Sequence, residues 1–180
     1  GLGLESDGEY MDISVKQSPS SKEAVERLNA VMAEGIEVLS WRELPENSKN
    51  AMASVAGADY EVRFREGYEL EEGWEKKLEK FLALPEIRIM KETKKGEQEV
   101  DIRPWVYDYH IKDQTIFLKV SAGSVHNLKP ELLLKAFGDW AGVEIPAFAL
   151  LICRKEMYAD EGSETERKLV ALEELGEEIG

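Results

Sequence analysis

The stretch from Glu97 to Glu131 constrains the fold most, because strand patterns, a turn and a helix start follow one another within it. Apolar and polar residues alternate over 100–103 and again over 116–120, on either side of Asp113-Gln114. Such alternation is typical of strands with one buried face. A loop containing Gly123 comes next, and a helix is expected directly after it. Strand, glycine loop and helix start are therefore predicted to converge on one spot.

The helix start could receive an anion. Pro130 is expected to begin the helix, because proline is tolerated at the first helical position and pushes the preceding Lys129 out of the α region. Backbone N–H groups there lack helical partners, so an anionic group could dock with help from Lys129. The alternative is an ordinary turn, capped by Asn127 or Ser124, in which Gly123 serves only the backbone. The chain contains neither GxGxxG nor GxxxxGK[ST], so no nucleotide-binding motif favours the anion site over the ordinary turn.

Basic residues gather around this stretch although the chain is strongly acidic. Its 37 acids and 23 bases give a formal net charge of −14, which repels phosphate backbones at long range. If the hairpin, the loop and the last strand share one end of a sheet, their cations could form an anion-binding patch beside Trp105, Tyr107 or Tyr109. The alternative is that Lys94 and Lys95 are solvated turn residues and that Arg103 pairs with a nearby acid. The candidate anion- or partner-binding residues are Lys91, Arg103, Gly123, Ser124, Asn127, Lys129 and Arg154.

Three separated motifs resemble those of a known family. They are GEYMDI at 8–13, DIRP at 101–104 and AGSVHNLKPE at 122–131. In this order they resemble the bacterial radical SAM-linked proteins, a domain of unknown function found beside, or fused to, radical SAM enzymes. The resemblance extends to about Asp160 and implies an enzyme of that class as a partner. It also implies an upstream part, with a strand, a helix and a hairpin, before the point in the pattern at which this chain starts.

The first part of the chain is expected to form a strand–helix–strand unit. Alternation predicts strands over 9–16 and 36–44, and Ser20 followed by Glu23 predicts a capped helix between them. Residues 45–58 are expected to form a connector, in which a short helix is possible around 48–55. The domain interpretation is an incomplete first lobe over 1–56.

The second part is expected to carry the larger lobe, over 57–160. Its predicted elements are a strand at 60–64, a helix that Pro85 ends, a hairpin of 87–93 with 97–103, the strand at 116–120, the helix from Pro130 and a strand at 147–153. Ser163 and Glu166 then predict a charged helix over 161–180.

This order favours an α+β fold with mainly antiparallel sheets and helices on one face. Each half resembles a split βαβ unit, so the expected architecture is two ferredoxin-like lobes with the first lobe truncated. A truncated lobe would leave an exposed strand edge that a second copy of the chain could complete as a homodimer.

Residue types that carry chemistry are sparse. A radical SAM enzyme holds its cluster through three closely spaced cysteines, and this chain has only Cys153, so it is not expected to be that enzyme. His110, His126 and Cys153 are scattered, whereas zinc sites need paired ligands at short spacing; no metal, cofactor or catalytic residue is therefore assigned. No stretch has the length of a membrane-spanning helix, and Gly1–Asp12 lacks a signal-peptide pattern, so a cytoplasmic location is expected.

Two functions follow from these patterns. The first is a non-catalytic partner or substrate-handling module of a radical SAM enzyme encoded nearby. The alternative is a module that binds structured RNA or takes part in RNA modification, favoured by the basic and aromatic residues at 91–129 and opposed by the net charge.

Overall fold

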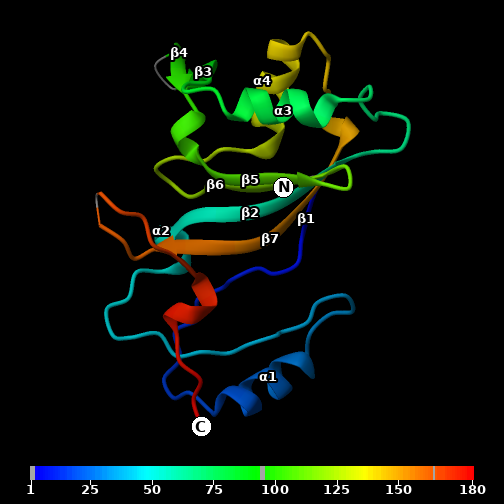
Figure 1. Ribbon diagram of the computed structural model, residues 1–180. Helices are drawn as coiled ribbons and strands as arrows, with labels where there is room; N and C mark the ends of the chain where they lie inside the picture. Colours follow the sequence, from blue (N-terminus) through cyan, green and yellow to red (C-terminus); the bar gives the residue numbers. More distant parts are fainter. Residues whose placement is uncertain (1–2, 94–95, 164) are drawn as a thin grey trace.

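The computed structural model describes residues 3–93, 96–163 and 165–180, and its centre is a six-stranded sheet covered by helices on one face (Figure 1). The sheet has the order β1-β7-β2-β6-β5, with β8 paired to β7, and every pairing is antiparallel except that of β1 with β7. The strands are β1 (Leu4–Ser6), β2 (Val55–Phe64), β5 (Val106–Lys112), β6 (Thr115–Ser121), β7 (Leu150–Asp160) and β8 (Leu169–Ala171). The predicted α+β class with a mainly antiparallel sheet is confirmed.

The helices α3 (Trp74–Leu82) and α4 (Pro130–Ala141) confirm two predictions from periodicity. The chain runs β2-α3-β5-β6-α4-β7, which is the β-α-β-β-α-β succession of a split βαβ unit. The predicted hairpin is also present, as β3 (Arg88–Thr93) and β4 (Gly96–Asp101), which form a separate two-stranded sheet between α3 and β5. Pro130 begins α4, and Gly142, with φ of 71°, ends it.

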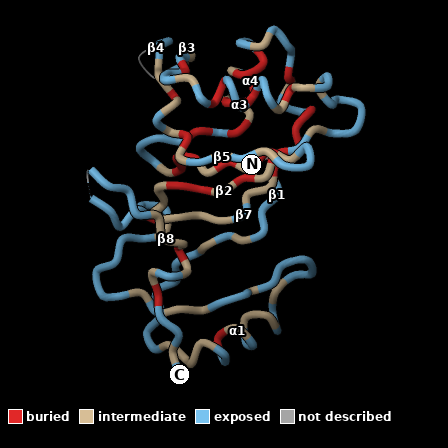
Figure 2. Tube along the Cα trace, viewed as in Figure 1, coloured by how far each residue is buried: buried red, intermediate tan, exposed pale blue. Residues whose placement is uncertain are grey.

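The core lies between the main sheet and these two helices, where Figure 2 shows the buried residues concentrated. Along β6, Ile116, Leu118 and Val120 are buried, whereas Phe117 and Lys119 are only partly buried on the opposite face. Phe137 of α4 is fully buried against the same cluster. Burial of each such side chain stabilises the folded state by roughly 1.5–3 kcal/mol. The apolar faces of the alternating strands and of the amphipathic helices therefore pack against one another.

The first part of the chain differs from its prediction. The helix is confirmed as α1 (Ser21–Asn29), whose Ser20 side chain accepts a hydrogen bond from the Glu23 N–H at 3.3 Å, and the short helix is confirmed as α2 (Ala51–Ser54). The expected strands at 9–16 and 36–44 are wrong: neither run is a strand, and only Glu43 forms an isolated bridge, to Glu177.

The predicted C-terminal helix over 161–180 is also wrong. The Ser163 hydroxyl accepts a hydrogen bond from the Glu166 N–H at 3.1 Å, as a capping box requires, but this contact closes the turn between β7 and β8. Strand β8 then pairs with β7, and Leu172–Leu175 form a short 3-10 helix that buries Leu172. The free edge of β7 forms hydrogen bonds with the backbone of 169–171. This pairing with a strand outweighs the local sequence preference for a helix.

One strand was not predicted. Asp113 and Gln114, both with positive φ, form the two-residue turn of a hairpin. The partner of β6 across this turn is β5, at 106–112, and not the run at 97–103. Tyr107, Tyr109 and Ile111 are half-buried and alternate with exposed polar residues at 108, 110 and 112, so the strand period is present in the sequence of β5.

Candidate functional site

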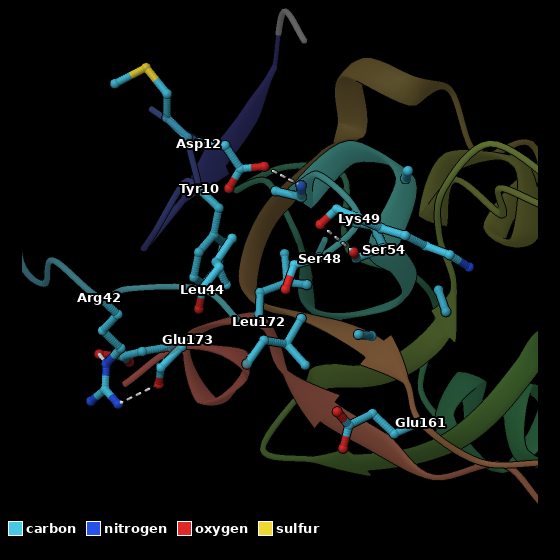
Figure 3. Close-up of a pocket in the computed structure, with 18 of the residues that line it drawn as sticks. Tyr10, Asp12, Arg42, Leu44, Ser48, Lys49, Ser54, Glu161, Leu172 and Glu173 are labelled. Carbon is cyan, nitrogen blue, oxygen red and sulfur yellow. Dashed lines mark hydrogen bonds and ion pairs between the residues drawn. The ribbon is translucent and has the colours of Figure 1, made fainter. Parts of the chain in front are cut away.

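A cavity of about 910 Å³ lies where the main sheet meets the N-terminal and C-terminal segments (Figure 3). One wall comes from the ends of the strands, at Ala56, Tyr107 and Ala159. Residues between 8 and 18 and between 39 and 55 form further walls, and Leu172–Gly176 complete the lining. The site is therefore built from segments that lie far apart in the sequence.

The predicted glycine loop forms one side of this cavity. Gly123 has φ of 119°, and a Cβ there would lie 2.2 Å from the Val55 carbonyl oxygen, so only glycine lets the loop approach β2. The Ser121 hydroxyl donates to the His126 carbonyl oxygen at 2.9 Å and fixes the loop across its base. Ser124, Val125 and His126 line the cavity, and Val125 is 84% exposed.

The same loop lies beside the β3–β4 hairpin. The rings of Trp105 and His126 stack with centroids 4.8 Å apart, and the Lys91 ammonium lies 5.1 Å from the centroid of the Trp105 ring. Arg103 belongs to the 3-10 turn after β4, where its Nη1 donates to the Val106 carbonyl oxygen at 3.0 Å. The structure thus brings Lys91 and Arg103 close to the loop, with Arg103 bonded within its own turn.

The other candidate residues do not share this place. Lys129 is the residue before α4 and is exposed, as is Asn127, and neither side chain forms a hydrogen bond or ion pair with a described residue. Arg154 lies in the middle of β7 opposite Tyr60, where it pairs with Glu9. Lys94 and Lys95 lie outside the described residues. Of the predicted site residues, only Ser124 lines the cavity, and the cations do not form a single patch there.

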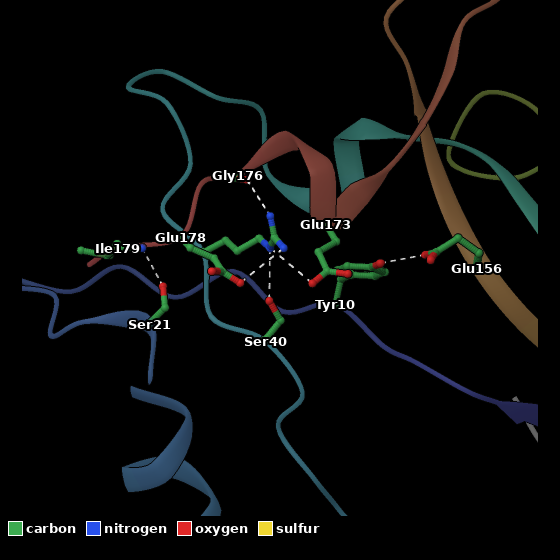
Figure 4. Close-up of polar contacts among 9 residues, drawn as sticks. Tyr10, Ser21, Ser40, Glu156, Glu173, Gly176, Glu178 and Ile179 are labelled. Atoms are coloured by element: carbon green, nitrogen blue, oxygen red, sulfur yellow. Dashed lines mark hydrogen bonds and ion pairs between the residues drawn. The ribbon is translucent and has the colours of Figure 1, made fainter. Parts of the chain in front are cut away.

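Arg42 holds the C-terminal segment in place through Glu173, Gly176 and Glu178, which are labelled in Figure 4. Its guanidinium lies 3.3 Å from the Glu173 carboxylate and 3.7 Å from that of Glu178, and its Nη1 donates to the Gly176 carbonyl oxygen at 3.4 Å. Glu43 and Glu177 exchange two backbone hydrogen bonds of 2.9 Å. The chain after β8 is therefore a strap that closes one side of the cavity.

Tyr10 links the cavity to the sheet. Its hydroxyl donates to the Glu156 carboxylate at 2.7 Å, and burial together with this bond raises the pKa of Tyr10. Burial and a hydrogen bond to Asp59 raise the pKa of Tyr158 in the same way. Both hydroxyls therefore stay protonated and act as donors at neutral pH. The Asp12 carboxylate accepts from the Ala51 N–H and so fixes the start of α2.

Several lining residues escaped the sequence analysis. Tyr10 and Asp12 fall within GEYMDI, a motif that was used only for the family resemblance. The sequence therefore contained a signal for these two residues. Arg42, Leu172 and Glu173 had no local signal, because their role depends on where the strap lies. Within the described ranges, no three His, Cys, Asp or Glu side chains are arranged to hold a metal ion. None of the helices in this part of the chain has the length and apolar character to cross a bilayer.

Comparison with known proteins identifies the family of the chain. No curated protein matches the chain, and no solved structure does. A family model described as "Uncharacterized protein conserved in bacteria (DUF2344)" matches residues 1–130, which is most of the chain. By this match the chain belongs to the DUF2344 family of conserved bacterial proteins.

Proposed function

We propose that the chain is a non-catalytic partner or substrate-handling module of a radical SAM enzyme encoded nearby, and that it works through the cavity. The resemblance of its three motifs to radical SAM-linked proteins supports the choice of partner. One observation carries the choice of site. Residues of GEYMDI at 8–13 and of AGSVHNLKPE at 122–131 line the same cavity although they lie far apart in the sequence.

The size and lining of the cavity suit a bound group. Its volume of about 910 Å³ falls within the range of roughly 300–1,000 Å³ that small-molecule and cofactor sites occupy. The lining combines apolar side chains such as Ile13, Leu44 and Leu172 with polar ones such as Lys49 and Ser54. Apolar surface provides affinity in such sites, and a few polar groups orient what is bound.

The test combines the purified chain with the radical SAM enzyme whose gene adjoins its own. Calorimetry should detect saturable association, and the pair should turn over substrate faster than the enzyme alone. Ala53 and Met52 are adjacent and both exposed in α2, but only Ala53 lines the cavity. Ala53→Trp should therefore lower turnover by the pair about tenfold or more, whereas Met52→Trp should leave it unchanged. Absence of association, or equal effects of the two variants, would contradict the proposal.

RNA binding is the second candidate, and one observation favours it. Lys91, Trp105 and His126 form a row of stacked side chains at the junction of hairpin and loop, and such rows can hold unstacked bases. The net charge of −14 opposes this reading. Changing Lys91 and Trp105 together to alanine should weaken salt-dependent binding of a structured RNA in a gel shift. Binding that is indifferent to both changes would remove the basis for this candidate.

A further inference from the structure

The backbone of residues 9–17 has no hydrogen-bonding partner, although this run borders the cavity. Strand β1 ends at Ser6, and Asp7 makes the last bond to β7, from its N–H to the Arg154 carbonyl oxygen at 3.0 Å. The Gly8 carbonyl oxygen still accepts from the Ser6 hydroxyl at 2.9 Å, but from residue 9 to residue 17 no backbone N–H or C=O bonds to another described residue. Gly8, Tyr10 and the three residues after Tyr10 all line the cavity. The wall therefore presents free backbone donors and acceptors, which are the groups that recognise another polypeptide backbone.

Apolar side chains stand at every second position of this run. Met11 is 75% exposed, Ile13 45% and Val15 46%, and all three line the cavity. Polar residues occupy the positions between them. Large apolar side chains that line a cavity without being buried leave contact area for a ligand. Their period of two matches the spacing of side chains along one face of a strand.

A second run with the same properties lines the cavity from the other N-terminal segment. Residues 39–45 contribute to the lining, and Leu39 is 70% exposed. Val38 is held by the Asn29 side chain, which accepts from its N–H at 2.7 Å and donates to its carbonyl oxygen at 2.9 Å. From there to the Glu43 bridge, the backbone makes no hydrogen bond with a described residue. The cavity is thus bordered by two runs that have strand-like sequences and no strand partner.

The charge around the cavity is negative. Among the described residues that line it, five are carboxylates and two are Lys or Arg. The Arg42 guanidinium is already engaged with Glu173 and Glu178, whereas the Glu43 and Glu161 carboxylates form no hydrogen bond or ion pair with a described residue. A ligand that enters here therefore meets uncompensated negative charge, which favours positive groups at its ends.

We infer that the cavity binds an extended polypeptide segment of a partner protein, apolar at alternate positions and flanked by Lys or Arg, which adds as a strand to residues 10–16. The free backbone specifies a polypeptide, the row of Met11, Ile13 and Val15 specifies alternating apolar side chains, and the carboxylates specify basic ends. The inference deepens the proposed function and rests on it, because it names what the same cavity receives.

A second copy of this chain fits less well. Its own strand-like runs carry Glu9 and Asp12 in one case and Glu37 and Glu43 in the other, so they would bring further negative charge to an acidic cavity. The net charge of −14 adds long-range repulsion between copies. The segment is therefore expected from a different protein, and the homodimer that an exposed edge suggests is not the expected state.

The probe is a synthetic peptide of sequence KKVTVTVKK, titrated into the whole chain and followed by calorimetry and by amide hydrogen exchange. Two control peptides share its length: one carries Glu in place of each Lys, and one is N-methylated at alternate backbone nitrogens. KKVTVTVKK should bind about tenfold or more tightly than either control, and binding should slow exchange at residues 10–16. Ile13→Asp should weaken binding about tenfold, whereas Val31→Asp, at an exposed position outside the cavity lining, should not.

Equal affinity for the three peptides, or binding that Ile13→Asp leaves intact, would overturn the inference. A chain that is dimeric in light scattering, with residues 10–16 already protected from exchange, would also overturn it in favour of a second copy. The peptide assay contains no radical SAM enzyme. Failure of the peptide together with intact association of chain and enzyme would therefore reject the strand and leave the proposed function standing.

Discussion

The imidazole of His126 stacks on the indole of Trp105 with ring centroids 4.8 Å apart and planes inclined by 24°. This contact joins the loop after β6 to the turn after β4, and it lies at the edge of the cavity that His126 helps to line. An aromatic pair of this kind contributes about 0.5–1.5 kcal/mol beyond its burial. The loop's position relative to the hairpin therefore depends on it.

His126→Ala should lower the free energy of unfolding by about 0.5–1.5 kcal/mol and speed amide exchange at 123–127. The fold should persist, because Ser121 bonds the backbone carbonyl of residue 126 and not its ring. His110→Ala removes a comparable stack, on Phe117 at 4.3 Å, from the sheet face opposite the buried side chains of β6. Urea denaturation with hydrogen exchange checks both variants. Equal exchange in the loop for the two would contradict the role assigned to His126.

Gly123→Ala should destabilise the chain more than Gly142→Ala. Both glycines have positive φ, which costs an L residue about 1–3 kcal/mol. Only at Gly123 would the new Cβ also collide with the Val55 carbonyl oxygen, whereas nothing lies within 4 Å of a Cβ at Gly142. Denaturant midpoints compare the two variants directly. A larger loss at Gly142 would show that the close approach of loop and strand is not needed.

Arg42→Met should release the C-terminal strap with little change in overall stability. Partly exposed ion pairs contribute about 0–1 kcal/mol, so the free energy of unfolding should fall only slightly. Exchange at Gly176 and Glu177 should rise clearly, because Arg42 holds this segment through Glu173, Glu178 and the Gly176 carbonyl. Arg27→Met removes an exposed ion pair with Glu23 in α1 and is the matched control. If both variants loosen the strap equally, Arg42 does not hold it.

Acid should weaken the attachment of β1. Hydrogen bonds from Lys155 and then Cys153 lower the pKa of Asp7 below its ordinary value of 3.8. A lowered folded-state pKa gives stability that is present above the unfolded-state value and is lost as the pH falls through the folded-state value. Stability of the wild type relative to Asp7→Asn should therefore shrink as the pH drops below about 4.

The ion pair between Asp7 and Lys155 also predicts a loss of stability at high pH. The hydrogen bond to Asp7 raises the pKa of Lys155 above 10.5, so the contribution of Lys155 is present below that value and is lost as the pH rises through the raised pKa. Lys155→Met should remove the basic dependence and reduce the acidic one, because the hydrogen bond from Cys153 to Asp7 remains. Denaturation at a series of pH values measures it, and parallel profiles for wild type and Asp7→Asn would contradict the assignment.

Much of the larger half was predictable because its signals are local. Pro130 and Gly142 bracket α4, and the buried residues of β6 follow the alternation in the sequence. Gly123 was also recognised, although its closeness to Val55 was not. For the cavity, the sequence indicated the loop at 122–131 but neither Arg42 nor Glu173. These two residues meet only because the C-terminal strap passes beside Arg42, and the course of the strap depends on the pairing of β8 with β7.

The sequence by itself determined where apolar residues alternate, where helices begin and end, and which loop needs glycine, since these depend on backbone geometry within a few residues. Only the tertiary structure decided which alternating runs became strands. Among the described residues, 9–16 and 36–44 have the pattern but no partner strand beyond the single Glu43 bridge, whereas 169–171 pair with β7 despite a helix signal. A strand needs hydrogen bonds from a neighbour that is distant in sequence, and periodicity carries no information about that neighbour.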